Sequence, residues 1–88
     1  MKTAFRSSFA RDLKKIRDRS VLRQVHVTIE EVEGAAHVQA IGKLRKMSGG
    51  GNFYRIQIGD YRIGLVIEAD EVEFVRCLHR RDIYRFFP

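Results

Sequence analysis

The residues best suited to chemistry lie in the last third of the chain. Arg62 sits in an Asp-Tyr-Arg segment, and His79, Arg80 and Tyr84 follow near the end. Metal-free cleavage of RNA requires that charge on a phosphorane be neutralised, which bidentate arginine contacts to phosphate can do. It also requires proton transfer, for which histidine and tyrosine are suitable. These four residues form the candidate catalytic set. No spacing of cysteines or histidines indicates a metal, and no motif indicates a cofactor.

The proton-transfer role has two candidates, and each has a structural alternative. Histidine titrates near neutrality and can act as acid or base, whereas a tyrosine becomes a base only where neighbouring cations favour its phenolate. A single histidine such as His79 is more often structural. Tyr84, beside Ile83 and Phe86, could anchor the chain end to the core instead. The sequence leaves open which of the two is the general base.

Five further cations are candidates for binding the RNA backbone. They are Lys43, Arg45, Lys46, Arg55 and Arg81. An arginine on a sheet face is often only a solvated strand residue, which is the competing interpretation. The glycines of residues 48–51 could cradle a phosphate, but no GKS/T motif follows, so this segment is more typical of a mobile connection.

Strand signals place Arg55 and Arg62 on a three-stranded antiparallel meander, which His79 to Tyr84 directly follow. The strands are predicted at Asn52–Ile58, Tyr61–Glu68 and Val72–Leu78, joined by tight turns at Gly59-Asp60 and Ala69-Asp70. The first turn has glycine where a type II′ turn requires it. Because two-residue loops fix the register, the cross-strand partners follow directly.

This register divides the meander into an apolar face and a cation-bearing face. On the cation-bearing face we expect Arg62 directly opposite Cys77, with Arg55 diagonal to it and His79 at the same end. A partly exposed thiol in that position could be reactive. Arg76 conflicts with the alternation, so either it lies near an edge or the register is wrong by one at that end. The apolar face is expected to pair Ile58 with Tyr61, Ile56 with Ile63, Tyr54 with Leu65, Ile67 with Val72, Leu65 with Phe74, and Tyr61 with Leu78.

The first half of the chain predicts the layer that covers the apolar face. A short extended start at Lys2–Phe5 precedes a helix that Ser7 could cap, and a second helix ends near Gly34. Residues 35–47 are predicted to be loop with a possible short turn of helix. The fold class is therefore α+β with two layers: an N-terminal strand, an antiparallel helical hairpin, the meander, and a short C-terminal turn or helix. The apolar positions of the two helices are Phe9, Leu13, Ile16, Leu22, Val25, Ile29 and Val32.

Size and charge set the remaining limits. The 88 residues predict a single domain over 1–88, with 17 Lys and Arg against 11 Asp and Glu. The first 29 residues hold eight cations and two acids, whereas residues 30–88 hold nine of each. Such a basic balance favours a polyanionic partner. A single cysteine and the lack of a signal or membrane-spanning segment predict a soluble protein of the reducing cytoplasm, with no membrane partner.

Two stretches resemble the RelE/ParE toxin superfamily of bacterial toxin–antitoxin modules. They are Tyr54–Ile63, which reads Y-R-I-x-I-G-D-Y-R-I, and Leu78–Arg85, which reads L-H-R-R-D-I-Y-R. The order of a strand, two helices and these motifs extends the resemblance over nearly the whole chain. It implies a RelE-like fold and a toxin held inactive by a cognate antitoxin in a hetero-oligomer. The RelE branch cuts mRNA on the ribosome without a metal.

The resemblance also implies a role for each matched residue. Arg62 corresponds to the arginine that stabilises the scissile phosphate, and Arg80 to a second phosphate contact or proton donor. Tyr84 matches a terminal tyrosine that serves some members as general base, and His79 stands where several members place a functional histidine. The lysines before Asn52 match the RNA-binding lysines only loosely, and no acidic residue between Ala35 and Asn52 matches the base of some members.

The resemblance leaves three functions open. The leading prediction is a ribosome-dependent mRNA endonuclease, or mRNA interferase, that inhibits translation. The ParE branch keeps the same motifs but is associated with inhibition of DNA gyrase, which is the first alternative. The second is a degenerate member that retains only antitoxin or nucleic-acid binding, with the first helix as its basic surface.

Overall fold

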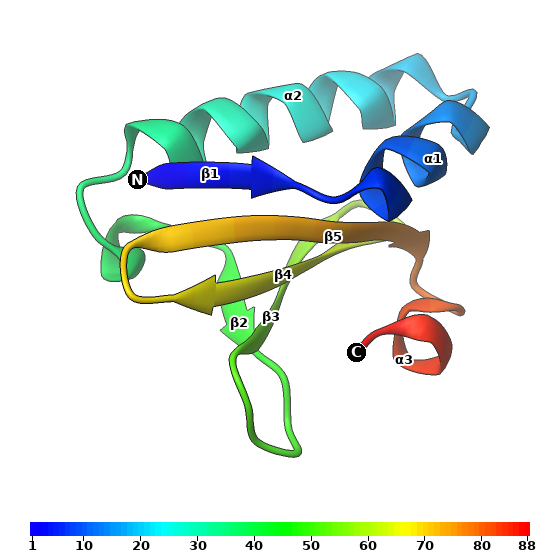
Figure 1. Cartoon of the computed structure of the whole chain (residues 1–88). Helices are drawn as coiled ribbons and strands as arrows, with labels where there is room; N and C mark the ends of the chain where they lie inside the picture. Colours follow the sequence, from blue (N-terminus) through cyan, green and yellow to red (C-terminus); the bar gives the residue numbers. More distant parts are fainter.

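A computed structural model describes all 88 residues and shows one five-stranded sheet with its two long helices on one face (Figure 1). The strand order is β1-β5-β4-β3-β2, with β1 parallel to β5 and every other pair antiparallel. The α+β class and the N-terminal strand are confirmed. No helix is both long enough and apolar enough to cross a membrane. In chain order the elements are β1 (Lys2–Phe5), α1 (Ser7–Lys15), α2 (Arg19–Gly34), a 3₁₀ turn η1 (Val38–Ala40), β2 (Leu44–Lys46), β3 (Phe53–Ile58), β4 (Tyr61–Glu68), β5 (Glu71–His79) and α3 (Ile83–Phe86).

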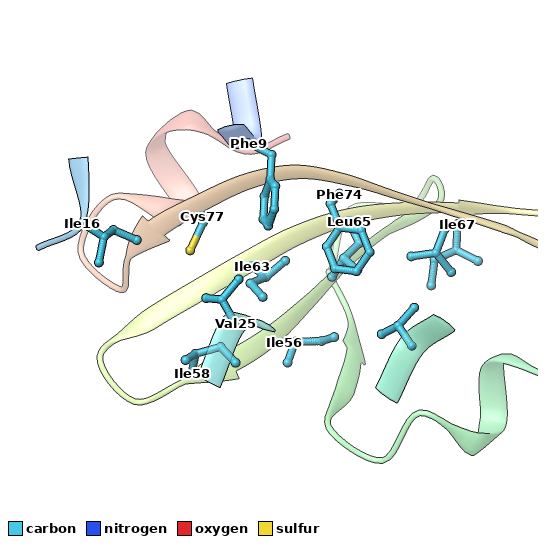
Figure 2. Close-up of a cluster of buried hydrophobic side chains, with 12 residues drawn as sticks. Phe9, Ile16, Val25, Ile56, Ile58, Ile63, Leu65, Ile67, Phe74 and Cys77 are labelled. Atoms are coloured by element: carbon cyan, nitrogen blue, oxygen red, sulfur yellow. The ribbon is translucent and has the colours of Figure 1, made fainter. Parts of the chain in front are cut away.

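The main core lies between the two long helices and the sheet. Phe9 of α1 and Val25 and Val32 of α2 are buried against the predicted apolar face (Figure 2). These side chains recur at helical spacing, so each helix buries one stripe and leaves its charged face in water. The sheet contributes Ile56, Ile58, Ile63, Leu65, Ile67, Val72, Phe74 and Cys77.

The first helix begins differently from the prediction. Ser7 is the first helical residue rather than the cap, and Arg6, at the N-cap position, makes no side-chain cap bond. Helix α2 is capped by Asp18, whose carboxylate accepts from the amides of Ser20 at 2.9 Å and Val21 at 3.3 Å. Asp18 lies where the apolar periodicity of the first helix breaks, so the break marks a cap. The second helix ends close to the predicted position, with Gly34 as its last residue and Ala35, rather than Gly34, as its C-cap.

Strand β2 is absent from the prediction, which described residues 35–47 as loop. The short helical turn expected there is present as η1. The following residues pair with β3 in an antiparallel register that places Arg45 opposite Arg55. The three glycines after Ser48 form the connecting loop, and all three have positive φ. Only three residues long, β2 carries no apolar alternation for a sequence pattern to detect.

A β-bulge at Val75 overturns the predicted register between β4 and the end of β5. The predicted pairs between β3 and β4 are confirmed. Between β4 and β5, the pairs of Leu65 with Phe74 and of Ile67 with Val72 are confirmed. Beyond Phe74 one extra residue on β5 shifts every partner, because Gly64 faces Arg76 rather than Val75. The predicted pairs of Arg62 with Cys77 and Tyr61 with Leu78 are therefore wrong. The observed pairs are Arg62 with Leu78, Ile63 with Cys77 and Tyr61 with His79.

Helix α1 occupies the edge of β5 that β1 leaves free after Phe74. The Arg6 amide donates to the Phe74 carbonyl at 2.9 Å, and the Ser8 hydroxyl donates to the carbonyl of the bulged Val75. The Asp12 carboxylate accepts from the Cys77 amide at 2.9 Å. Backbone groups that the bulge and the strand edge expose are thus satisfied by one helix.

The C-terminal segment packs on the opposite face of the sheet, below β5 in Figure 1. Ile83 and Phe87 are buried there with Met47 and Val75. Gly64 makes room for this packing, since a Cβ on it would lie 2.7 Å from the Phe87 ring. The structure therefore has a partial third layer in addition to the two predicted ones, and the C-terminal segment forms it.

Candidate nucleic-acid interface

A polar groove runs over the outer strands of the sheet face that carries no long helix. Lys43, Arg45, Arg55 and Gln57 line it, with backbone from Gly42 and Gly59, and its volume is about 580 Å³. Cross-strand pairing puts Arg45 beside Arg55, and Arg55 beside Gly64. A Cβ on Gly64 would point toward Phe87 of the C-terminal segment. The groove therefore lies on the same face as that segment.

The cations of this groove have no acidic partner. None of Lys43, Arg45 and Arg55 forms an ion pair, and the Arg45 guanidinium donates only to backbone carbonyls. Like charges directly opposite each other destabilise a pair of strands. Repulsion between Arg45 and Arg55 thus destabilises the fold, and an anion bound in the groove would reduce this repulsion.

Arg62 and Arg80 flank the same β3–β4 turn. The Arg62 guanidinium donates to the carbonyls of Gly59 at 2.8 Å and Tyr61 at 2.9 Å, so it folds back over the turn. The Arg80 amide donates to the Asp60 carbonyl at 2.7 Å, and its side chain lies 4.0 Å from the Asp60 carboxylate. Arg62 is also the cross-strand partner of Gln57, which lines the groove. The structure therefore brings both arginines next to the groove.

The structure separates His79 from Arg62. Because of the bulge, His79 pairs with Tyr61 on the side of the long helices, whereas Arg62 pairs with Leu78 on the other side. The rings of His79 and Tyr61 meet edge to face with centroids 5.6 Å apart. Nδ1 of His79 accepts from the Arg81 amide at 3.2 Å, which leaves Nε2 to carry the proton of the neutral ring. The expectation that these two residues share a face is wrong.

The remaining predicted residues, Tyr84, Arg81 and Lys46, do not line the groove. Tyr84 follows the buried Ile83 in α3 and is 64% exposed. Arg81 is exposed in the turn before α3. Lys46 pairs with Tyr54, so strand alternation points it to the side of the long helices, away from Arg45.

Asp12 and Arg76 form a buried ion pair at the edge of β5. Nε and Nη2 of Arg76 donate to the two carboxylate oxygens at 2.8 and 3.1 Å. This hydrogen bonding raises the pKa of Arg76. The predicted alternation pointed Arg76 toward the apolar face. In the structure Arg76 lies at a free edge of β5, and the predicted register was wrong by one at this end. Burial, with a smaller contribution from Asp12, raises the pKa of Cys77 to about 12, and an exposed reactive thiol there is ruled out.

Sequence reasoning missed Asp12 and the contribution of β2. Asp12 is a carboxylate on the apolar side of α1, between Phe9 and Ile16, and a charge in a core stripe is a signal for a buried partner. The glycines that bracket Lys43 to Lys46 were a signal for a short hairpin strand.

A small α+β domain with an uncompensated basic groove on the open face of a five-stranded sheet defines the structural class. The sequence from residue 4 to residue 84 matches the family model described as ParE toxin of type II toxin–antitoxin system, parDE. The chain belongs to this family of toxins from toxin–antitoxin modules.

Relatives and solved structures agree with this assignment. Toxin RelE3 of Methanocaldococcus jannaschii is 35% identical over 89 residues and is covered completely, as is this chain. The RelB–RelE antitoxin–toxin complex from Methanococcus jannaschii contains a chain that is 34% identical, with a TM-score of 0.78 and coverage of 97% of this chain and 99% of that one. The YoeB dimer from Staphylococcus aureus shares the fold, with 14% identity, a TM-score of 0.70 and coverage of 90% and 95%. Because archaeal proteins are among the relatives, a bacterial origin stays a prediction.

Proposed function

We propose that this toxin cleaves mRNA on the ribosome, in the cytoplasm and without a metal. The observation that carries the proposal is the Arg45–Arg55 pair in a groove that contains Lys43 and no carboxylate. A row of cations without acidic partners suits a phosphate backbone, because each phosphate brings one negative charge. The sequence relationship to Toxin RelE3 supports the same choice.

The chemistry falls to residues around the β3–β4 turn. Arg62 and Arg80 neutralise the charge that develops on the phosphorane, which is the larger contribution to catalysis. Tyr84 in α3 handles proton transfer, since α3 and Arg62 lie on the same side of the sheet. His79 faces the other side, so we place Tyr84 rather than His79 at the reacting phosphate.

A cognate antitoxin is the second part of the proposal. The related RelE chain was solved as a complex with the antitoxin RelB. A partner that covers the groove with acidic side chains would relieve the repulsion between Arg45 and Arg55 and block RNA at once. We expect a short reading frame beside this one whose product co-purifies with the toxin as a hetero-oligomer.

Cell-free translation tests the nuclease. Purified toxin added to the reaction should produce mapped cuts in the message, and Arg62→Ala should reduce the cleavage rate by about 10²-fold or more, as loss of a preorganised charge contact does. Arg23→Ala, which removes an exposed cation of α2, is the matched control and should cleave like the original chain. Intact messages and unimpaired translation would refute the proposal.

Inhibition of DNA gyrase is a second candidate, favoured by the match to the ParE family model. A supercoiling assay separates the two functions. Inhibition that survives the double substitution Arg62→Ala and Tyr84→Phe would select gyrase, because these residues serve only the nuclease.

A further inference from the structure

A second cavity lies on the other side of the β3–β4 turn, between α1, the end of β5 and α3. Its volume is about 450 Å³, within the range of small-molecule sites. Ten residues line it, and five of these are Ile16, Tyr61, Leu78, His79 and Phe86. Three of these five side chains carry aromatic rings, whereas the phosphate groove has none.

The aromatic rings offer a stacking surface. Tyr61 and His79 hold each other edge to face, with an interplanar angle of 73°. Phe86 is 53% exposed, and the Arg85 guanidinium lies 5.9 Å from its ring centroid. A large ring left half in water beside a cation is costly for the chain alone, but such a pair is typical of surfaces on which nucleobases stack.

Two charged side chains of the cavity, Lys15 and Asp82, have no partner within the chain. Neither Lys15 nor Asp82 makes a side-chain hydrogen bond or ion pair, whereas Asp12 and Arg76 satisfy each other. Lys15 can donate to a ring nitrogen or carbonyl, and Asp82 can accept from an amino or imino group. A free carboxylate repels a phosphate, so this pair suits the edge of a base rather than the backbone.

The cavity and the groove meet at the same turn. Tyr61 directly precedes Arg62 on β4, and strand alternation points their side chains to opposite sides of the sheet. His79 directly precedes Arg80, whose amide donates to the Asp60 carbonyl in this turn. We propose that this cavity binds one nucleobase of the RNA strand whose phosphates follow the groove, so that the strand crosses the β3–β4 turn. This inference rests on the proposed function and adds to it a site that reads a base.

Non-cleavable 2′-O-methyl RNA hexamers provide the test. One residue at a time is replaced by an abasic unit, and binding is followed by fluorescence anisotropy. We expect one position at which loss of the base weakens binding by about tenfold, the typical contribution of a stacked base, and little effect elsewhere. A 2-aminopurine at that position should lose fluorescence on binding, because stacking quenches it.

Two substitutions locate the effect in the cavity. Phe86→Leu keeps an apolar side chain but removes the ring, so it should abolish the difference between the intact and abasic hexamers. Phe5→Leu is the matched control, since Phe5 is 49% exposed and does not line the cavity. Asp82→Asn should change the base preferred at the sensitive position, because the amide can donate where the carboxylate can only accept.

The outcomes separate this inference from the proposed function. Equal affinity for every abasic hexamer, with binding that still weakens in salt, would overturn the base site and leave the phosphate groove standing. A base effect that persists in both Phe86→Leu and Asp82→Asn would place the base elsewhere and also overturn the inference. Failure to bind any hexamer, on or off the ribosome, would overturn both.

Discussion

Asp12 joins α1 to β5 through three hydrogen bonds, two from the Arg76 guanidinium and one from the Cys77 amide. Its side chain is only 5% exposed, and that of Arg76 is 26% exposed. A buried carboxylate is stable only when its charge and its lone pairs are satisfied, and both conditions are met here. The pair also fixes the strand immediately after the bulge, so one residue of α1 positions the end of β5 that carries His79 and Arg80.

Removal of the Asp12 charge should therefore destabilise the fold. Asp12→Asn keeps the size of the side chain but leaves the Arg76 guanidinium without its counter-charge, and we expect a loss of about 2–3 kcal/mol in the free energy of unfolding. Urea denaturation measures it. Glu71→Gln is the control, because its ion pair with Lys2 is exposed and 3.8 Å long and should contribute less than about 1 kcal/mol. Similar losses in both variants would contradict a special role for Asp12.

At the level of elements, the contact between Gly64 of β4 and Phe87 fixes the C-terminal segment on the sheet. Glycine is needed here for space, since its φ is not among the positive values. The contact holds α3 beside the strand that carries Arg62. The position of Tyr84 therefore depends on Gly64, which lies twenty residues earlier in the sequence.

Gly64→Ala should displace this segment. A Cβ at 2.7 Å from the Phe87 ring forces a shift, and we expect a loss of about 1–3 kcal/mol, as for overpacked cores. Gly34→Ala is the matched control, because a Cβ there meets nothing within 4 Å. Hydrogen exchange should show faster exchange of the α3 amides in Gly64→Ala alone. Unchanged protection of α3 would mean that Phe87 does not hold the segment.

The sequence predicts elements well where the pattern is local. Alternation and a two-residue turn were enough for the β3–β4 register, and helical spacing was enough for both long helices. The bulge at Val75 could not be predicted, because it depends on Ser8 and Asp12 of a helix more than sixty residues away. The β3–β4 register was sufficient to place Arg55 and Arg62 on the same face of the sheet. His79 lies beyond the bulge, so it was assigned to the wrong side.

Over the whole molecule, the residues that give the chain its net positive charge are not the residues that line the basic groove. The first 29 residues carry the entire excess of cations, and the cations of α1 and α2 are exposed. The groove belongs to the balanced part of the chain, where acids such as Glu68, Glu71 and Glu73 gather at the other end of the sheet. If the toxin binds RNA as proposed, we expect the overall charge to attract RNA to the molecule and the local arrangement to decide where it binds.

The salt dependence of RNA binding should report the groove rather than the basic helices. Four cations, Lys43, Arg45, Arg55 and Arg62, can each contact one phosphate, so the logarithm of the binding constant should fall against the logarithm of salt concentration with a slope of about −3. Arg55→Gln should reduce the steepness of that slope by about 0.7, the share of one phosphate on a single strand. Arg11→Gln removes the same charge from the exposed face of α1 and should leave the slope nearly unchanged. Equal changes in the two variants would show that RNA responds only to net charge, and the larger change in Arg11→Gln would move the RNA surface to the first helix.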